Sequence, residues 1–141
     1  MDNLSPLERS AQMRLVRSKD TKPEMRVRRL VHSLGYRYQI HRSDLPGKPD
    51  LVFPSRHRVI QVNGCFWHGH SCRLGRMPKS GLDYWRMKII SNQERDKKSV
   101  KSLRKLGWKC LTVWECTLGD EDKLAKRIIN FLDPPQKSDL P

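Results

Sequence analysis

An α/β fold, with a mixed β-sheet flanked by helices, is the class that this sequence predicts. Three observations support it: helical apolar spacing at both ends of the chain, short strand-like runs between them, and a long helical stretch before a last apolar strand. The 141 residues fit one domain with a modest core. We expect an N-terminal arm over residues 1–20, the main domain over 21–133 and a disordered tail over 134–141.

The first elements are helical. Residues 5–17 can form a short basic helix. Thr21 is a suitable N-cap for a second helix, Glu24 completes a capping box, and Gly35 ends the helix after apolar residues at helical spacing.

Three short strands are expected next, over residues 36–40, 50–53 and 58–63, with a turn joining the last two into a hairpin. A polar, glycine-containing segment then leads to a long helix over residues 82–106. A buried strand over residues 108–114 follows, and because the long helix is a crossover, we expect this strand to run parallel to a strand of the hairpin. An amphipathic helix over residues 120–132 completes the domain.

Charge points to a polyanionic partner. The formal net charge is +14, and residues 73–109 hold 12 Lys or Arg against three acids. Such an excess favours nucleic acid through counterion release, although a solvated helix surface is the alternative explanation for the long helix. No apolar run approaches the ~18 residues of a membrane-spanning helix. No secretory signal is evident, so we expect a cytoplasmic, nucleoid-associated protein whose four cysteines are thiols or metal ligands.

Asp50 is the first candidate for catalysis. It follows a Pro-Gly-Lys-Pro turn, and on the next strand Gln61 and Asn63 share the face that Val59 occupies, whereas Ile60 and Val62 share the other. A carboxylate at the strand ends, together with a backbone carbonyl, suits Mg²⁺ and phosphate chemistry. The alternative role for Asp50 is capping a strand after a turn.

The segment Gly64–Cys72, GCFWHGHSC, is the most informative stretch. His70 and Cys72 are candidate ligands for a structural Zn²⁺, with Asp96 and Cys116 as distant ligands. Ordinary thiols and a solvated histidine are the alternative, and the other two cysteines, Cys65 and Cys110, resemble core thiols. His68 is placed to act as a general acid or base near Asn63.

Aromatic residues raise a separate question. Phe66 and Trp67 precede His68, and Trp85 begins the long helix. Such rings pack in a core or, on a basic protein, enter the DNA stack.

Together with LPGKPD, NQERDKK, VWEC and RSKDTKPE, the GCFWHGHSC segment resembles the very-short-patch repair (Vsr) endonuclease family over roughly residues 8–132. The resemblance implies a restriction-endonuclease-like core with a structural zinc site. It also implies Mg²⁺-dependent nicking of double-stranded DNA on the 5′ side of the thymine in a T:G mismatch. The protein would act as a monomer on DNA, with a mismatch-recognition protein and a repair polymerase as partners.

Several residues match the family motifs. Asp50 matches the catalytic, metal-binding aspartate, and Val62 matches the position whose backbone carbonyl helps hold Mg²⁺. His68 matches the catalytic histidine and Glu24 an acid near the metal. The positions that match the zinc ligands are His70, Cys72, Asp96 and Cys116. The positions that match the DNA-binding residues are Phe66, Trp67, Trp85, Met13 and Arg14.

Asn63 departs from the family, whose best-known members carry a second histidine there. Asn63 cannot take up a proton at neutral pH, nor supply the positive charge that related nuclease folds often place nearby. We therefore expect His68 to bear more of the acid–base work, or the substrate preference to differ from a strict T:G. Two alternatives stay open: a restriction-type or defence nuclease acting on other DNA, and a zinc-stabilised DNA-binding module without catalysis.

Overall fold

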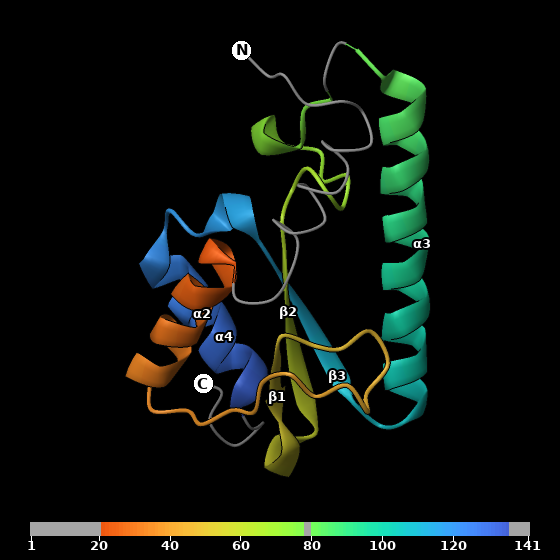
Figure 1. The fold of residues 1–141 in the computed structure, drawn as a ribbon. Coiled ribbons are helices and arrows are strands. Elements are labelled where there is room, and N and C mark those ends of the chain that lie inside the picture. Colours follow the sequence, from red (N-terminus) through yellow and green to blue (C-terminus); the bar gives the residue numbers. More distant parts are fainter. Residues whose placement is uncertain (1–20, 78–79, 136–141) are drawn as a thin grey trace.

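A computed structural model describes residues 21–77 and 80–135, in which helices lie on two sides of a small sheet. Figure 1 shows three layers, with helices α2 and α4 on one side of the strands and helix α3 on the other. The bounds of the elements, in chain order, are α2 Lys22–Ser33, β1 Leu51–Phe53, β2 Arg58–Asn63, α3 Leu82–Lys105, β3 Lys109–Trp114 and α4 Glu121–Leu132. The mixed sheet with flanking helices is as predicted.

The sheet has the order β1-β2-β3 and contains both kinds of pairing. β1 and β2 form the predicted antiparallel hairpin, with Leu51 opposite Ile60. β2 and β3 run parallel, with Asn63 opposite Trp114, and α3 is the crossover between them. Since both parallel strands end at the same edge, the segments that follow Asn63 and Trp114 begin side by side there.

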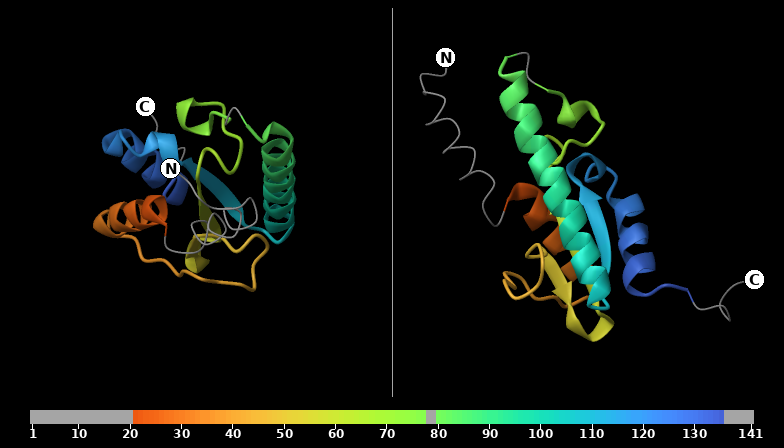
Figure 2. Two further views of the ribbon diagram at one scale, coloured as in Figure 1. Left: turned by 45° about the horizontal axis from the view of Figure 1, so that its top comes forward. Right: turned by 90° about the vertical axis from the view of Figure 1, so that its right-hand side faces the viewer.

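Two apolar clusters hold the layers together. Ile60 and Val62 belong to the larger cluster, under α2 and α4, whereas Val59 packs in a smaller one with Leu103 of α3. The alternation of side chains along β2 therefore divides its residues between the two faces, as the sequence predicted. The turned views in Figure 2 show α3 extending along the opposite side of the sheet from α2 and α4.

Helix α2 begins as its sequence indicates. The side chain of Thr21 accepts a hydrogen bond from the Glu24 N–H at 3.4 Å, and Gly35, with a φ of +92°, follows the last turn. Val27 and Val31 are fully buried against the sheet. The N-terminus of α2, which carries Glu24, thereby lies over the sheet edge where Asp50 sits.

One predicted strand is wrong. Residues 36–40 make only an isolated bridge, in which Gln39 exchanges hydrogen bonds of 2.8 and 2.9 Å with Val52. The Tyr36 N–H bonds back to the end of α2, and His41, with a φ of +58°, turns the chain away from the sheet. Local hydrogen bonds at both ends thus leave room for a single pair.

The strand β3 also differs from expectation. It was predicted to be buried, but only Val113 is buried and Lys109 is exposed, because one face of β3 lines cavities through Thr112 and Trp114. Within the described residues, no helix is long and apolar enough to cross a membrane.

The segment of residues 41–49, here called the strap, links the bridge to β1. It crosses the face of the sheet toward α3 (Figure 1), where Leu45 packs in the cluster with Leu103. At its tip, a Cβ on Gly47 would come within 2.6 Å of the Ser99 Cβ on α3. The strap therefore has no room to move closer to α3. It leads directly into Asp50, the residue that precedes β1.

The predicted arm over residues 1–20, its helix over 5–17, and Met13 and Arg14 lie outside the described residues. Of the predicted tail, residues 136–141 lie outside them as well.

Candidate active site and metal centre

Asp50 stands beside a second buried acid. Its Oδ2 accepts a hydrogen bond of 2.6 Å from the Val62 N–H. Burial raises the pKa of Asp50 to about 7, the Val62 N–H lowers it, and the neighbouring Glu24 raises it again. Glu24 is 8% exposed and pairs with Arg28 at 3.3 Å. Two carboxyl groups that repel each other in a buried setting form a place where a divalent cation is favoured.

These acids line a cavity of about 340 Å³ that also contains the other predicted catalytic groups. Asn63 and His68 lie on its wall, as does Val62. The structure thus brings four predicted catalytic residues together: Glu24 from α2, Asp50 from the position before β1, Asn63 from β2 and His68 from the segment after β2. The contact seen for Val62 is made by its N–H, so the metal-binding role of its carbonyl stays a prediction.

His68 is held by an acid from α3. Its Nδ1 contacts the Asp96 carboxylate in a short hydrogen bond. A carboxylate on one ring nitrogen fixes the orientation of the imidazole and stabilises its charged form. Nε2 is thereby left as the ring atom that can exchange a proton with a substrate or a water molecule.

The loop that carries His68 is fastened to α3 by two further side chains. Asn92 donates to the Trp67 carbonyl at 2.8 Å, and Gln93 donates to the His68 carbonyl at 3.3 Å. Asn92 is 4% exposed, and Gln93 is half-buried. The position of His68 is consequently set by α3 as well as by β2.

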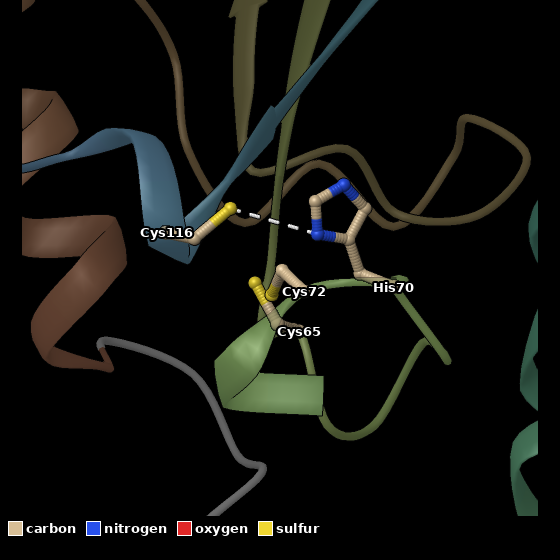
Figure 3. Close-up of side chains that lie close together, drawn as sticks. All are labelled: Cys65, His70, Cys72 and Cys116. Atoms are coloured by element: carbon tan, nitrogen blue, oxygen red, sulfur yellow. Dashed lines mark hydrogen bonds between the residues drawn. The ribbon is translucent and has the colours of Figure 1, made fainter. Parts of the chain in front are cut away.

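The predicted zinc ligands are corrected in one member. Cys65, His70, Cys72 and Cys116 have ligand atoms within 4.8 Å of one another (Figure 3). Asp96 is absent from this cluster because its carboxylate is occupied by His68. Cys65, predicted to be a core thiol, takes its place, since the turn after β2 directs it toward His70 and Cys72. Cys110, the other predicted core thiol, does pack against a core cluster.

Three thiols and one imidazole are the donor set that structural zinc sites use. Cys116 Sγ lies 3.5 Å from His70 Nδ1, the contact drawn as a dashed line in Figure 3. The four residues come from the segment after β2 and from the turn after β3, which start at the same sheet edge. The residues present therefore fit a zinc ion that would join these two turns.

Two thiols of this cluster, Cys72 and Cys65, differ in their pKa. Burial opposes ionisation of Cys72, but hydrogen bonds from His70, Cys65 and the backbone of Gly75 and Leu74 lower its pKa to about 7. Burial raises the pKa of Cys65 to about 12. A thiolate at Cys72 is available near neutral pH, whereas Cys65 ionises only with a cation beside it.

The aromatic residues form one cluster. The ring centroid of Phe66 lies 5.2 Å from those of Trp67 and Trp85, and the ring centroids of Tyr84 and Trp85 are 5.0 Å apart. All three pairs pack edge to face. Trp85 is 8% exposed, so core packing describes it in the free protein, whereas Phe66 and Trp67 are half-buried. Tyr84, 47% exposed, was missed, although its position next to Trp85 was a signal.

Sequence reasoning also missed the role of Cys65 and the cations of the cavity. Cys65 stands five residues before His70, which is far enough for the turn to bring both to one point. Lys48 and Arg95 line the active-site cavity. Lys48 belongs to the same Pro-Gly-Lys-Pro turn that singled out Asp50, so that turn was the available signal.

A solved structure shares this fold. The catalytic domain of the homing endonuclease I-Bth0305I superposes with a TM-score of 0.54 at 21% identity, covering 79% of this chain and 94% of that one. A likeness at this identity concerns the fold alone, which this chain shares with that domain.

Sequence comparison then gives the family. The family described as DNA mismatch endonuclease Vsr matches residues 1–74. The type II nicking enzyme V.XorIIP of Xanthomonas oryzae pv. oryzae is 54% identical over 133 residues, covering 94% of this chain and 98% of the relative. The DNA mismatch endonuclease Vsr of Escherichia coli K12 is 40% identical over 117 residues, covering 83% of this chain and 75% of the relative. The chain belongs to the Vsr family and is a DNA endonuclease.

Proposed function

We propose that this protein nicks double-stranded DNA on the 5′ side of the thymine in a T:G mismatch by Mg²⁺-dependent hydrolysis of the phosphodiester bond. The observation that carries the proposal is the shared cavity, in which the paired acids Asp50 and Glu24 face the His68–Asp96 pair. The name of the Escherichia coli relative supports the mismatch as substrate.

Asp50 and Glu24 are the residues that would hold the magnesium ion. Carboxylate oxygens are the ligands that this cation prefers, and burial beside Glu24 raises the pKa of Asp50 even though Arg28 pairs with Glu24. When bound, Mg²⁺ would supply positive charge next to the phosphate and make a nearby water more acidic.

His68 performs the proton transfer in this proposal. Its Nε2 accepts a proton from the attacking water, and Asp96 stabilises the imidazolium that forms. As the water oxygen bonds to phosphorus, the bond from phosphorus to the 3′ oxygen breaks. The departing 3′ oxygen takes a proton from a solvent water and becomes the 3′ hydroxyl, and a 5′ phosphate is left on the thymine. Asn63, on the same wall, donates a hydrogen bond but takes no proton, so His68 is the group that changes protonation state.

The aromatic cluster supports selection of a mismatch. Insertion of Phe66 and Trp67 into DNA would require unstacking, which costs a few kcal/mol per step. A weakly stacked T:G step makes this deformation cheaper than a matched step does. The zinc cluster would brace the same segment, and the basic helix α3 would contact flanking phosphates. A monomer on DNA, with a mismatch-recognition protein and a repair polymerase as partners, completes the proposal.

The experiment compares otherwise identical duplexes that carry T:G, T:A or C:G at one position, labelled in turn on each strand, with and without added Mg²⁺. We expect one nick, 5′ to the mismatched thymine, only with Mg²⁺. Asp50→Asn should abolish nicking and keep DNA binding. The matched control is Asp44→Asn on the strap, whose carboxylate pairs with Arg42 at the surface and should leave nicking unchanged.

A second function is favoured by a specific observation. The relative with 54% identity is called a type II nicking enzyme, and Asn63 replaces a histidine of the best-known members. A nuclease acting on a fixed site in other DNA would cut matched duplexes as fast as the T:G duplex. Equal cutting would reject the mismatch-repair role, and binding without any cutting would leave the DNA-binding module.

A further inference from the structure

The positive charge at the wall of the active-site cavity has no assigned role. Among the described residues lining this cavity, two are cations, Lys48 and Arg95. Four carboxyl groups line the same cavity, those of Glu24, Asp50, Asp96 and Glu115, and a DNA phosphate brought beside them adds further negative charge. Asn63 brings no charge to compensate. In addition to the Mg²⁺ ion proposed above, a cationic side chain on the wall would therefore stabilise a phosphate in this cavity.

Lys48 sits on a tightly held turn. Its N–H donates to the Leu45 carbonyl at 3.1 Å, and the Gln61 side chain donates to the Gly47 carbonyl at 3.3 Å. Gly47 meanwhile abuts Ser99 of α3, where even a Cβ would not fit. The strap tip is thereby anchored to β2 and to α3, and Lys48 is presented from a fixed backbone.

The backbone of Lys48 is also unusual. Its φ of +45° lies in the left-handed region, which is unfavourable for a lysine. Residues keep such a conformation where the surrounding structure imposes it, and these cases cluster at functional sites. Two residues later the chain reaches Asp50, so the position of Lys48 is coupled to that of the acid.

Lys48 lies close to the acids without pairing with them. It lines the active-site cavity and also a smaller cavity of about 130 Å³, which Glu24 and Asp50 line as well. Within the described residues, no ion pair joins Lys48 to either acid. Lys48 thus shares both cavities with the carboxylates and remains available to an anion that enters from solvent.

We propose that Lys48 binds the scissile phosphate and supplies the positive charge that Asn63 does not. The proposal rests on the hydrolytic function proposed above. Lys48 would donate to a non-bridging phosphate oxygen and stabilise the charge that develops as water adds and the 3′ oxygen leaves. Arg95 is the less suitable cation, since Lys48 lines both cavities that contain Glu24 and Asp50, whereas Arg95 lines only the larger of them.

The test is a thermodynamic cycle between Lys48 and the charge of one phosphate. Cleavage by the wild-type protein first maps the scissile linkage on the T:G duplex. Binding is then measured without Mg²⁺ for that duplex and for one with a neutral methylphosphonate at the mapped linkage. The variants are Lys48→Gln and Lys48→Asn, because asparagine tolerates the left-handed backbone. Lys48→Arg tests rescue, and Lys126→Gln on α4 is the matched control for loss of one charge.

We expect the wild-type protein to lose affinity about tenfold on the neutral linkage, whereas both neutral variants bind the two duplexes equally. The single-turnover nicking rate of both neutral variants should fall by about 100-fold at saturating DNA, and Lys48→Arg should restore most of it. Lys126→Gln should behave as the wild type does in both measurements.

Two results would overturn the assignment. One is a neutral variant that keeps the wild-type response to the methylphosphonate; the other is loss of that response in Arg95→Gln instead. Failure of the wild-type protein to nick contradicts the proposed function itself, whereas normal nicking by Lys48→Asn contradicts only the role of Lys48. The melting temperature of each variant separates loss of folding from loss of function, and the Lys48→Arg rescue answers the question even where a neutral variant unfolds.

Discussion

The two ligand clusters of this molecule differ in chemistry, although one short segment contributes to both. Gly64–Cys72 places His68 in an open cavity with the oxygen donors Asp50, Glu24 and Asp96, and it places Cys65, His70 and Cys72 in a cluster of sulfur and nitrogen donors. Oxygen donors with an accessible cavity suit a cation that must also meet substrate. Three thiols and an imidazole suit a cation that serves structure. Neighbouring residues of one segment can therefore serve two functions when their side chains meet different elements.

The largest effect is expected at the sulfur cluster. Cys65→Ser should remove the zinc and lower the melting temperature, because structural zinc contributes its binding free energy to folding. Loss of only ~3 kcal/mol corresponds to a decrease of roughly 10 °C for a domain of this size. Metal analysis and thermal unfolding measure both. Cys110→Ser, at a thiol outside the cluster, is the control and should retain zinc; loss of zinc there, or full zinc content in Cys65→Ser, would break the comparison.

A second prediction decides the cluster to which Asp96 belongs. Asp96→Asn should slow nicking by about 100-fold, because the amide cannot stabilise a charged His68. Zinc content and DNA affinity should stay at the wild-type level. Single-turnover kinetics and metal analysis of one preparation give the answer. A variant that loses zinc would return Asp96 to the sulfur cluster, where the sequence had placed it.

The third prediction concerns the pH dependence of stability that arises from Asp50 in the active-site cavity. The folded pKa of Asp50 is about 7 against an ordinary value of 3.8, so the folded state retains a proton that the unfolded state has lost. Stability should therefore be full below about pH 4 and decrease as the pH rises toward 7. Asp50→Asn removes this loss and should stabilise the Mg²⁺-free protein by about 4 kcal/mol at pH 8. Urea unfolding at pH 5 and pH 8 tests it, and an equal effect at both values would contradict the buried acid.

The smallest effect is expected at Asn63. Asn63→His would add a second titratable group to the cavity wall and should change the nicking rate by less than about tenfold. The informative readout is the pH–rate profile, which should gain a further ionisation in the variant. If the profile stays the same while His68→Asn is inactive, His68 alone carries the proton transfer. If His68→Asn retains its rate, another group does.

The sequence predicted those elements whose signal is local. Thr21 as N-cap, the alternation along β2 and the length of α3 are encoded in consecutive residues, and each was confirmed. Residues 36–40 had strand-like composition, but whether they pair depends on Val31 and His41 outside that run. The acids of the cavity were predicted because their positions match motifs of the family.

Asp96 and Cys65 show why the metal centre was only partly predicted. A helix face offers an acid to whichever neighbour lies within reach, and residue spacing does not say whether that neighbour is His68 or a cysteine. Cys65 was predicted to be a core thiol, and it is indeed fully buried. The residues around it, however, include the other members of the ligand cluster. The sequence alone does not tell whether a buried cysteine is a core thiol or a metal ligand.

Gly69 lies between the two histidines with a φ of +65°, against Gln93 and Ile89 of α3, with no room for a side chain. An inserted residue here would shift both histidines at once. A change in the length of this segment would therefore alter the active site and the zinc-ligand cluster together. We therefore expect lineages that acquire new DNA targets to vary mainly in their peripheral loops while the length of this stretch stays constant.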